Sequence, residues 1–278
     1  MKYALAILAG IVLFAALFPR TARKLFRKLG RSARDVGRAA QEIATGEELE
    51  GSPLARYEAK AGELIAARLL SRFPPSGDAP LQALVREAGE RLAACAARRE
   101  IPYRFAVVEA EEANAFAVPG GAVFVTRSLV ALVEGDRDRV AAALAHEVAH
   151  IDRRHALRAL AARAALKGLR LATLGRSAIL ERVSLGLEEL VLKGYGREQE
   201  LEADLFGVRI ARAAGFDPRG LLGLLSALES LRPPPSGPAG EILGYLGTHP
   251  SPEARRRAAE REIARLLSLP PGDLTSGS

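Results

Sequence analysis

The stretch Asp136–His150, which reads DRDRVAAALAHEVAH, decides the organisation of this chain. Its aspartates suit the N-terminus of a helix, and the alanines that follow are strong helix formers. Residues four apart share one face of a helix, so His146 and His150 can both point at one Zn²⁺. Glu147 can then reach a water at the metal as a general base. The alternative is a solvated helix with two chance histidines, because short motifs match by accident.

A zinc site of this kind needs a third protein ligand. In the longer pattern HExxHxxGxxH, a glycine and then a histidine follow the motif. Here Arg153 occupies the glycine position and Ala156 the histidine position. His155 comes one residue too early, so the class of zinc peptidases with this longer pattern is excluded. His155 is expected to be a structural residue or a neighbour of a ligand rather than a ligand itself.

The segment Arg197–Gly207, which reads REQELEADLFG, predicts a second helix. Glu200 and Asp204 are four residues apart and share one of its faces. Glu200 could bind zinc, and Asp204 could accept a proton from a ligand imidazole and orient it. The alternative, which this segment alone favours, is an acidic helix face paired with neighbouring arginines, namely Arg197, Arg209 and Arg212.

Taken together, HEVAH and the later ExxAD helix resemble the membrane-linked gluzincin zinc metallopeptidases, which form metallopeptidase family forty-eight. This family includes the HtpX and CAAX prenyl protease types. Asn114–Arg127, which reads NAFAVPGGAVFVTR, is similar to the family's hairpin before the zinc helix, and Thr248–Arg255, THPSPEAR, is similar to its THPxxxxR segment. The resemblance covers residues 53–266. It is closest to the BepA-like subgroup, since the chain has one strongly apolar segment.

The resemblance implies a role for each matching residue. One Zn²⁺ would be held by His146, His150 and Glu200, with Asp204 orienting a ligand. Glu147 would be the catalytic base. An edge strand of the hairpin would pair with an extended substrate, and it consists of Ala115, Phe116, Ala117 and Val118. His249 would be a fourth ligand or a stabiliser of the oxyanion.

The expected function is therefore zinc-dependent hydrolysis of peptide bonds by a metalloendopeptidase. Its substrates would be unfolded or damaged proteins, in the quality control of membrane or envelope proteins, as the resemblance implies. The alternative is a zinc-containing chaperone or assembly factor whose peptidase site is silenced, with His249 closing the open metal position.

Charge is concentrated near the N-terminus. The chain has 278 residues and a formal net charge of +7. Residues 20–38 alone carry +7 and Lys2 adds one more, so residues 39–278 sum to −1. A nearly neutral body offers no general field for polyanions, and no nucleic acid is expected as a partner. The basic run directly follows an apolar segment, which favours anionic lipid as the partner of residues 3–38.

Residues 3–18 form an uncharged apolar run that is either a membrane anchor or a signal segment. As a helix it would span about 24 Å, short of the ~30 Å hydrocarbon core. No small-x-small cleavage site follows, which favours an uncleaved single anchor. Positive charge after the run favours a cytoplasmic catalytic side, whereas the resemblance implies a periplasmic or extracytoplasmic one.

The expected fold is mostly α with a small β-sheet (α+β), arranged as a gluzincin zinc-endopeptidase domain. Helices are expected over residues 54–72 and 79–99 and through most of 136–267, with strands over 103–108, 115–118 and 122–126. The single cysteine, Cys95, excludes an intramolecular disulfide and is expected to be buried in the second helix. Four segments are expected: an apolar anchor or signal segment (1–19), a basic juxtamembrane segment and linker (20–52), the metallopeptidase domain (53–267) and a disordered tail (268–278).

Overall fold

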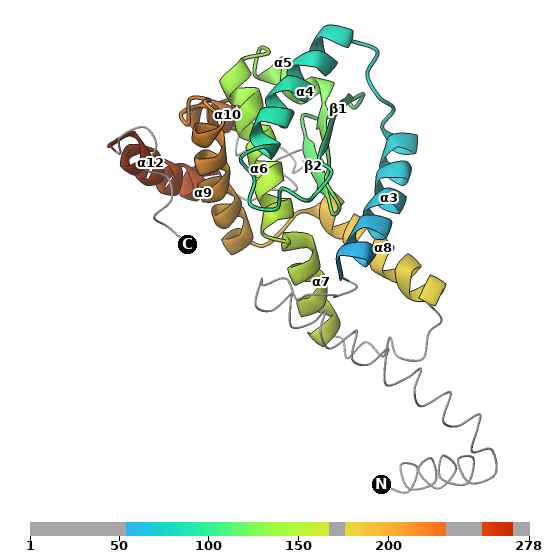
Figure 1. Cartoon of the computed structure of the whole chain (residues 1–278). Helices are drawn as coiled ribbons and strands as arrows, with labels where there is room; N and C mark the ends of the chain where they lie inside the picture. Colours follow the sequence, from blue (N-terminus) through green and yellow to red (C-terminus); the bar gives the residue numbers. More distant parts are fainter. Residues whose placement is uncertain (1–53, 167–175, 232–251, 269–278) are drawn as a thin grey trace, which may run out of the picture. The chain divides into compact units, whose positions relative to one another are not determined.

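The computed structural model describes residues 54–166, 176–231 and 252–268 (Figure 1). The expectation of a mostly helical protein with a small sheet is confirmed. None of the helices in these ranges is long and apolar enough to cross a membrane. The apolar run, the basic segment and His249 lie outside the described residues. The helices are α3 (Leu54–Arg72), α4 (Ala79–Ala93), α5 (Arg127–Leu132), α6 (Arg137–Asp152), α7 (His155–Leu166), α8 (Arg176–Lys193), α9 (Arg197–Ala213), α10 (Gly220–Ser230) and α12 (Pro252–Ser268).

The sheet has three strands, β1 (Arg104–Val108), β2 (Ala115–Val118) and β3 (Ala122–Thr126), in the order β1-β3-β2. β2 and β3 form an antiparallel hairpin, and β1 runs parallel to β3. The hairpin turn is Pro119-Gly120-Gly121, where both glycines have positive φ angles of 87° and 106°. A Cβ on Gly121 would also lie 2.6 Å from the side chain of Ile101. Only glycine satisfies this backbone conformation and this close contact.

α6 is the central helix of the fold. The side chain of Asp136 caps it by accepting a hydrogen bond from the backbone N–H of Arg139 at 2.9 Å. Every residue of the helix from Val140 to Ile151 is buried, as expected for a helix that neighbours cover on all sides. α6 lies between α9 on one side and α4 and the sheet on the other (Figure 1).

A glycine on α9 allows the two motif helices to approach closely. A Cβ on Gly207 would lie 3.0 Å from the backbone nitrogen of His146. The backbone of α9 therefore passes directly over the start of the HEVAH segment. This contact brings the acidic face of α9 against the histidine face of α6.

α4 is shorter than the sequence predicted, because it ends at Ala93 and not near residue 99. The next free backbone N–H groups, those of Ala97 and Arg98, donate to the carboxylate of Asp152 at 2.8 and 3.1 Å. These two hydrogen bonds to the last residue of α6 replace the ones that would have continued α4 as a helix. The prediction for Cys95 was correspondingly wrong: it lies beyond the helix and is only partly buried.

Candidate metal centre

Three buried side chains from two helices converge on one point. His146 and His150 come from α6, and Glu200 comes from α9. The two histidine Nε2 atoms are 3.0 Å apart, and Glu200 carboxylate oxygens lie 3.4 Å from His146 Nε2 and 3.5 Å from His150 Nε2. Each side chain is at most 1% exposed. Among the described residues, no other group of His, Cys, Asp and Glu meets in this way.

The spacing of these atoms suits a tetrahedral metal ion. Zinc bonds of about 2.0–2.2 Å in tetrahedral geometry place the donor atoms about 3.3–3.5 Å apart. Two of the observed separations, 3.4 and 3.5 Å, fall in this range, and the third, 3.0 Å, is slightly shorter. Two imidazole nitrogens and one carboxylate oxygen are also ligands that zinc favours. The donor set therefore fits a zinc ion with one position left for water or substrate.

The ring of His146 is held by a buried ion pair. Its Nδ1 lies 2.9 Å from Asp204 Oδ1. Arg255 of α12 donates from Nε and Nη2 to the two oxygens of the same carboxylate, each at 2.7 Å. Asp204 and Arg255 are 0% and 3% exposed. This arrangement keeps the Nδ1 proton of His146 on the Asp204 side and leaves Nε2 for the cluster.

Charge and burial shift the pKa values of this pair in opposite directions. Burial alone would raise the pKa of Asp204, but Arg255 and His146 outweigh it and lower the pKa to about 2. Burial alone would lower the pKa of His146, but hydrogen bonds to Asp204 and Glu200 raise it to about 9. Both carboxylates thus favour the doubly protonated imidazole of His146, so metal binding through Nε2 would compete with protonation.

The ring of His150 is held differently. Its Nδ1 lies 2.8 Å from Nδ1 of His155, whose Nε2 lies 3.0 Å from Glu202 Oε2. The ring of Tyr195 stacks on the face of the His150 ring, with centroids 4.4 Å apart and planes at 24°. Burial, together with the nearby charges of Glu147 and Glu200, raises the pKa of Tyr195, so its hydroxyl stays protonated.

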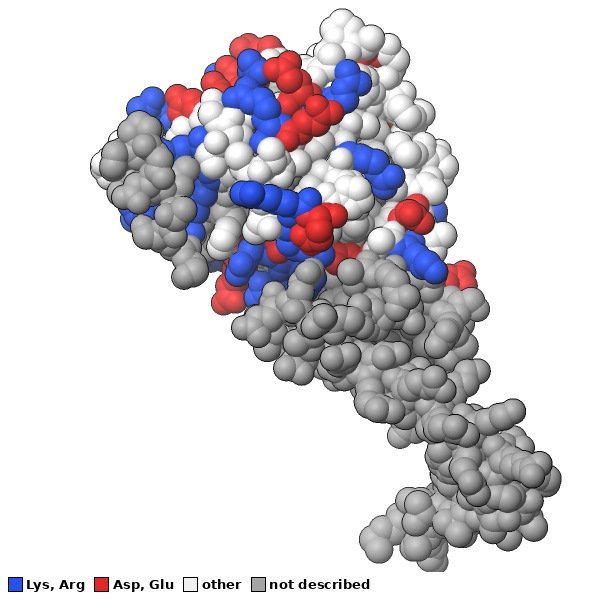
Figure 2. All heavy atoms as spheres, viewed as in Figure 1, with Lys and Arg blue, Asp and Glu red and all other residues white. Residues whose placement is uncertain are grey.

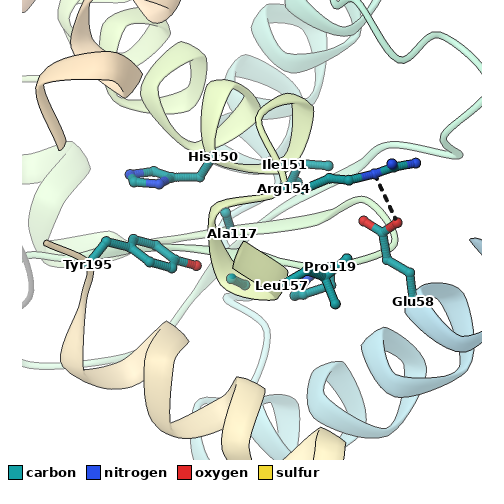
Figure 3. A pocket seen from close by; sticks show the side chains of 9 residues that line it. Glu58, Ala117, Pro119, His150, Ile151, Arg154, Leu157 and Tyr195 are labelled. Atoms are coloured by element: carbon teal, nitrogen blue, oxygen red, sulfur yellow. Dashed lines mark ion pairs between the residues drawn. The ribbon is translucent and has the colours of Figure 1, made fainter. Parts of the chain in front are cut away.

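A small pocket reaches His150 from the side of α3 and the hairpin turn. His150 and Tyr195 bound one end of it, and the ion pair between Arg154 and Glu58, at 3.9 Å, bounds the other (Figure 3). Its remaining lining is apolar and consists of Ala117, Pro119, Ile151, Ala156 and Leu157.

The structure brings most of the expected site residues together. His146, His150 and Glu200 form the cluster, Asp204 lies beside it, and Glu147 is buried on the same helix. His249 is outside the described residues. The expected substrate strand is β2, at one edge of the sheet, but its residues Ala115 to Val118 are all at most 4% exposed. Helices α6 and α8 pack against β2.

Two functional neighbours escaped the analysis of the sequence. Arg255 was noted within the THPSPEAR segment, but its ion pair with Asp204 was not foreseen. The chain offered only a weak indication for Tyr195, which lies between two glycines, Gly194 and Gly196, that interrupt the helical pattern. Neither residue shares a helix face with the ligand it supports, so periodicity could not reveal them.

Several known proteins are similar in sequence to this chain. The chain is 31% identical over 174 residues to "Mitochondrial metalloendopeptidase OMA1" of Schizosaccharomyces pombe, an alignment covering 62% of this chain and 50% of that protein. It is 28% identical over 224 residues to "Beta-barrel assembly-enhancing protease" of Yersinia pestis, covering 77% of this chain and 45% of that protein. It is also 27% identical over 168 residues to "Metalloprotease YcaL" of Escherichia coli K12, covering 59% and 63%.

This chain thus spans about half the length of the first two relatives. The family model described as "Peptidase family M48" matches residues 80–263, a range that contains α6, α9 and Arg255. The resemblance inferred from the motifs is therefore confirmed, and the chain belongs to peptidase family M48.

Proposed function

We propose that this chain is a zinc-dependent metalloendopeptidase that hydrolyses peptide bonds in proteins. The observation that carries the proposal is the buried cluster of His146, His150 and Glu200, whose donor atoms all lie within 4.8 Å of one another. It occurs in a member of a metallopeptidase family and beside a carboxylate, Glu147, that is not one of the three ligands.

Each residue has a distinct task in the proposed reaction. His146 and His150 bind through Nε2, and Glu200 binds through a carboxylate oxygen. Zn²⁺, when bound there, supplies Lewis acidity that lowers the pKa of water and polarises the scissile carbonyl. Glu147 takes a proton from the attacking water and delivers it to the leaving amine nitrogen. Asp204 holds His146 in the tautomer that keeps Nε2 free for binding.

The proposed substrates are unfolded or damaged proteins of a membrane or envelope. An extended segment would add to the edge of β2 through backbone hydrogen bonds, which depend little on side-chain identity. The names of two relatives point the same way, since one is a mitochondrial metalloendopeptidase and another enhances β-barrel assembly. The alternative, a zinc-containing chaperone or assembly factor with a silenced peptidase site, depends on His249, which lies outside the described residues.

We further propose that residues 3–38 bind membrane lipid as a single N-terminal anchor, followed by the catalytic domain from residue 53 to 267. The clustering of basic residues at 20–38 supports this, while the side of the membrane stays open between cytoplasmic and extracytoplasmic. On the face seen in Figure 2, basic and acidic side chains are interspersed and form no patch of a single sign.

The test compares wild type with Glu147→Gln in the full chain. Wild type should take up one zinc and cleave a casein-type substrate. Glu147→Gln should keep the zinc and lose about 10²–10⁴-fold in rate, because general-base action is lost. Glu198→Gln is the matched control, since Glu198 is exposed on α9. A wild-type chain that takes up no zinc on reconstitution contradicts the proposal, as does a Glu147→Gln variant that cleaves at the wild-type rate.

A further inference from the structure

His150 makes a contact that none of the motifs requires. Its Nε2 faces the cluster, so metal binding through Nε2 requires the proton of the neutral ring to be on Nδ1. That Nδ1 lies 2.8 Å from Nδ1 of His155. His155 must then accept at Nδ1 and, as a neutral ring, carry its own proton on Nε2.

The proton on His155 Nε2 has an acceptor in turn. Glu202 Oε2 lies 3.0 Å away. Two arginines hold this carboxylate in place, Arg153 from Nε at 2.6 Å and Arg158 from Nη1 at 3.1 Å. The backbone carbonyl of His155 accepts a hydrogen bond from Gln199 at 3.2 Å, which ties it to α9. The donors and acceptors thus run in one direction, from His150 through His155 to Glu202.

A break in the backbone makes this contact possible. On a continuous helix, five residues advance about 500°, so His155 would point about 140° away from His150. Instead α6 ends at Asp152 and α7 begins at His155, with Arg154 between them at φ +51°. A left-handed conformation is strained for any residue other than glycine. Here it turns the His155 ring back to within 4.8 Å of the His150 ring, and Arg154 is buried near Glu58.

We propose that His155 and Glu202 are positioning residues for the metal ligand His150. Together they form a relay that sets the tautomer and the orientation of its ring. The inference rests on the proposed metal site and extends it to residues that do not touch the metal. A purely structural His155, buried and satisfied by its partners, would affect unfolding but leave metal affinity unchanged.

The experiment measures Zn²⁺ affinity of the full chain by competition with a chromophoric chelator. His155→Phe fills similar space but lacks both ring nitrogens, and affinity should fall about 10–100-fold. His155→Asn places an amide oxygen at the Nδ1 position, accepts from His150, and should recover most of the loss. The visible absorption of the Co²⁺-loaded protein should change in His155→Phe and return toward wild type in His155→Asn.

A second variant covers the case in which His155→Phe fails to fold. Glu202 is partly exposed, so Glu202→Ala should fold and weaken Zn²⁺ binding toward the lower end of the same range, about 10-fold. Glu198→Ala, on the exposed face of the same helix, is the control and should bind like wild type. On a helix, Glu202 projects about 200° away from Glu200, so a model in which only the shared face of Glu200 and Asp204 matters predicts no effect of Glu202→Ala on the metal. The relay predicts a loss, so this variant distinguishes the two models.

The outcomes distinguish the relay from the proposed function. Wild-type affinity in His155→Phe and Glu202→Ala overturns the relay and leaves the metal site standing. Equal losses in His155→Phe and His155→Asn overturn the acceptor role of His155. A wild-type chain that binds no zinc overturns the proposed function and the relay together.

Discussion

The two ligand histidines sit on one helix four residues apart, yet the protein supports them in different ways. His146 donates directly to Asp204, a carboxylate that is 0% exposed and clamped by the buried Arg255. His150 reaches its carboxylate through a second imidazole, and Glu202 is 24% exposed with arginines that are more than 40% exposed. One support is a buried ion pair, and the other ends at the surface.

This difference has energetic consequences. Removing one partner of a buried ion pair leaves an uncompensated charge and typically costs about 3–5 kcal/mol. An exposed ion pair contributes about 0–1 kcal/mol. The residues that hold His146 should therefore be essential both to folding and to metal binding. Those that hold His150 should tolerate substitution with a smaller loss of stability. Four substitutions or conditions test this comparison, in decreasing order of expected effect.

The largest effect is expected for Asp204→Ala. Arg255 would be left as a buried, uncompensated charge, and the unfolding free energy should fall by about 3–5 kcal/mol. Zn²⁺ affinity should fall about 10–100-fold because His146 loses its acceptor. Denaturant unfolding of the metal-free protein and chelator competition measure the two quantities. The double variant Asp204→Ala, Arg255→Met should be less destabilised than the sum of the single variants; strict additivity would contradict the buried clamp.

A smaller effect is expected at Tyr195, whose ring stacks on the ring of His150. Tyr195→Leu removes an aromatic contact worth about 0.5–1.5 kcal/mol and should lower the unfolding free energy by that amount. Tyr195→Phe keeps the ring and serves as the control. If both variants unfold like wild type, the stack does not help hold His150.

The third test uses pH on α12, the helix that carries Arg255. Hydrogen bonds from Arg265 lower the pKa of Glu262 to about 2, and Arg209 of α9 contributes, although burial opposes them. A depressed folded-state pKa stabilises the protein above the ordinary value of 4.5, and this stability is lost as pH falls through about 2. The unfolding free energy of wild type should exceed that of Glu262→Gln by about 1 kcal/mol at neutral pH. This difference should shrink as the pH falls. A gap that is unchanged down to about pH 2.5 would refute this account.

The smallest effect is expected for Arg153→Ala. Arg153 is 41% exposed, and its bond to Glu202 is one of several that hold this carboxylate. The unfolding free energy should change by about 0–1 kcal/mol, and the change should shrink at high salt. If the unfolding free energy instead falls by several kcal/mol at all salt concentrations, Glu202 is held beside His150 as tightly as Asp204 is held beside His146.

Local patterns in the sequence were sufficient for the elements that carry the site. The alanine-rich run and Asp136 determined a helix that places His146 and His150 on one face, because helical periodicity depends only on spacing. The same rule placed Glu200 and Asp204 together. The hairpin over residues 115–126 followed from Pro119-Gly120-Gly121, since those glycines permit positive φ angles.

Only the tertiary structure decided which faces meet. The α9 segment alone favoured an acidic face paired with neighbouring arginines, whereas the close approach at Gly207 brings that face against His146. The end of α4 depends on Asp152, a residue more than fifty positions away in the chain. His155 reaches His150 through a left-handed arginine that no propensity favours. Such contacts arise from packing between distant segments, whereas the sequence alone determines the local geometry within each of them.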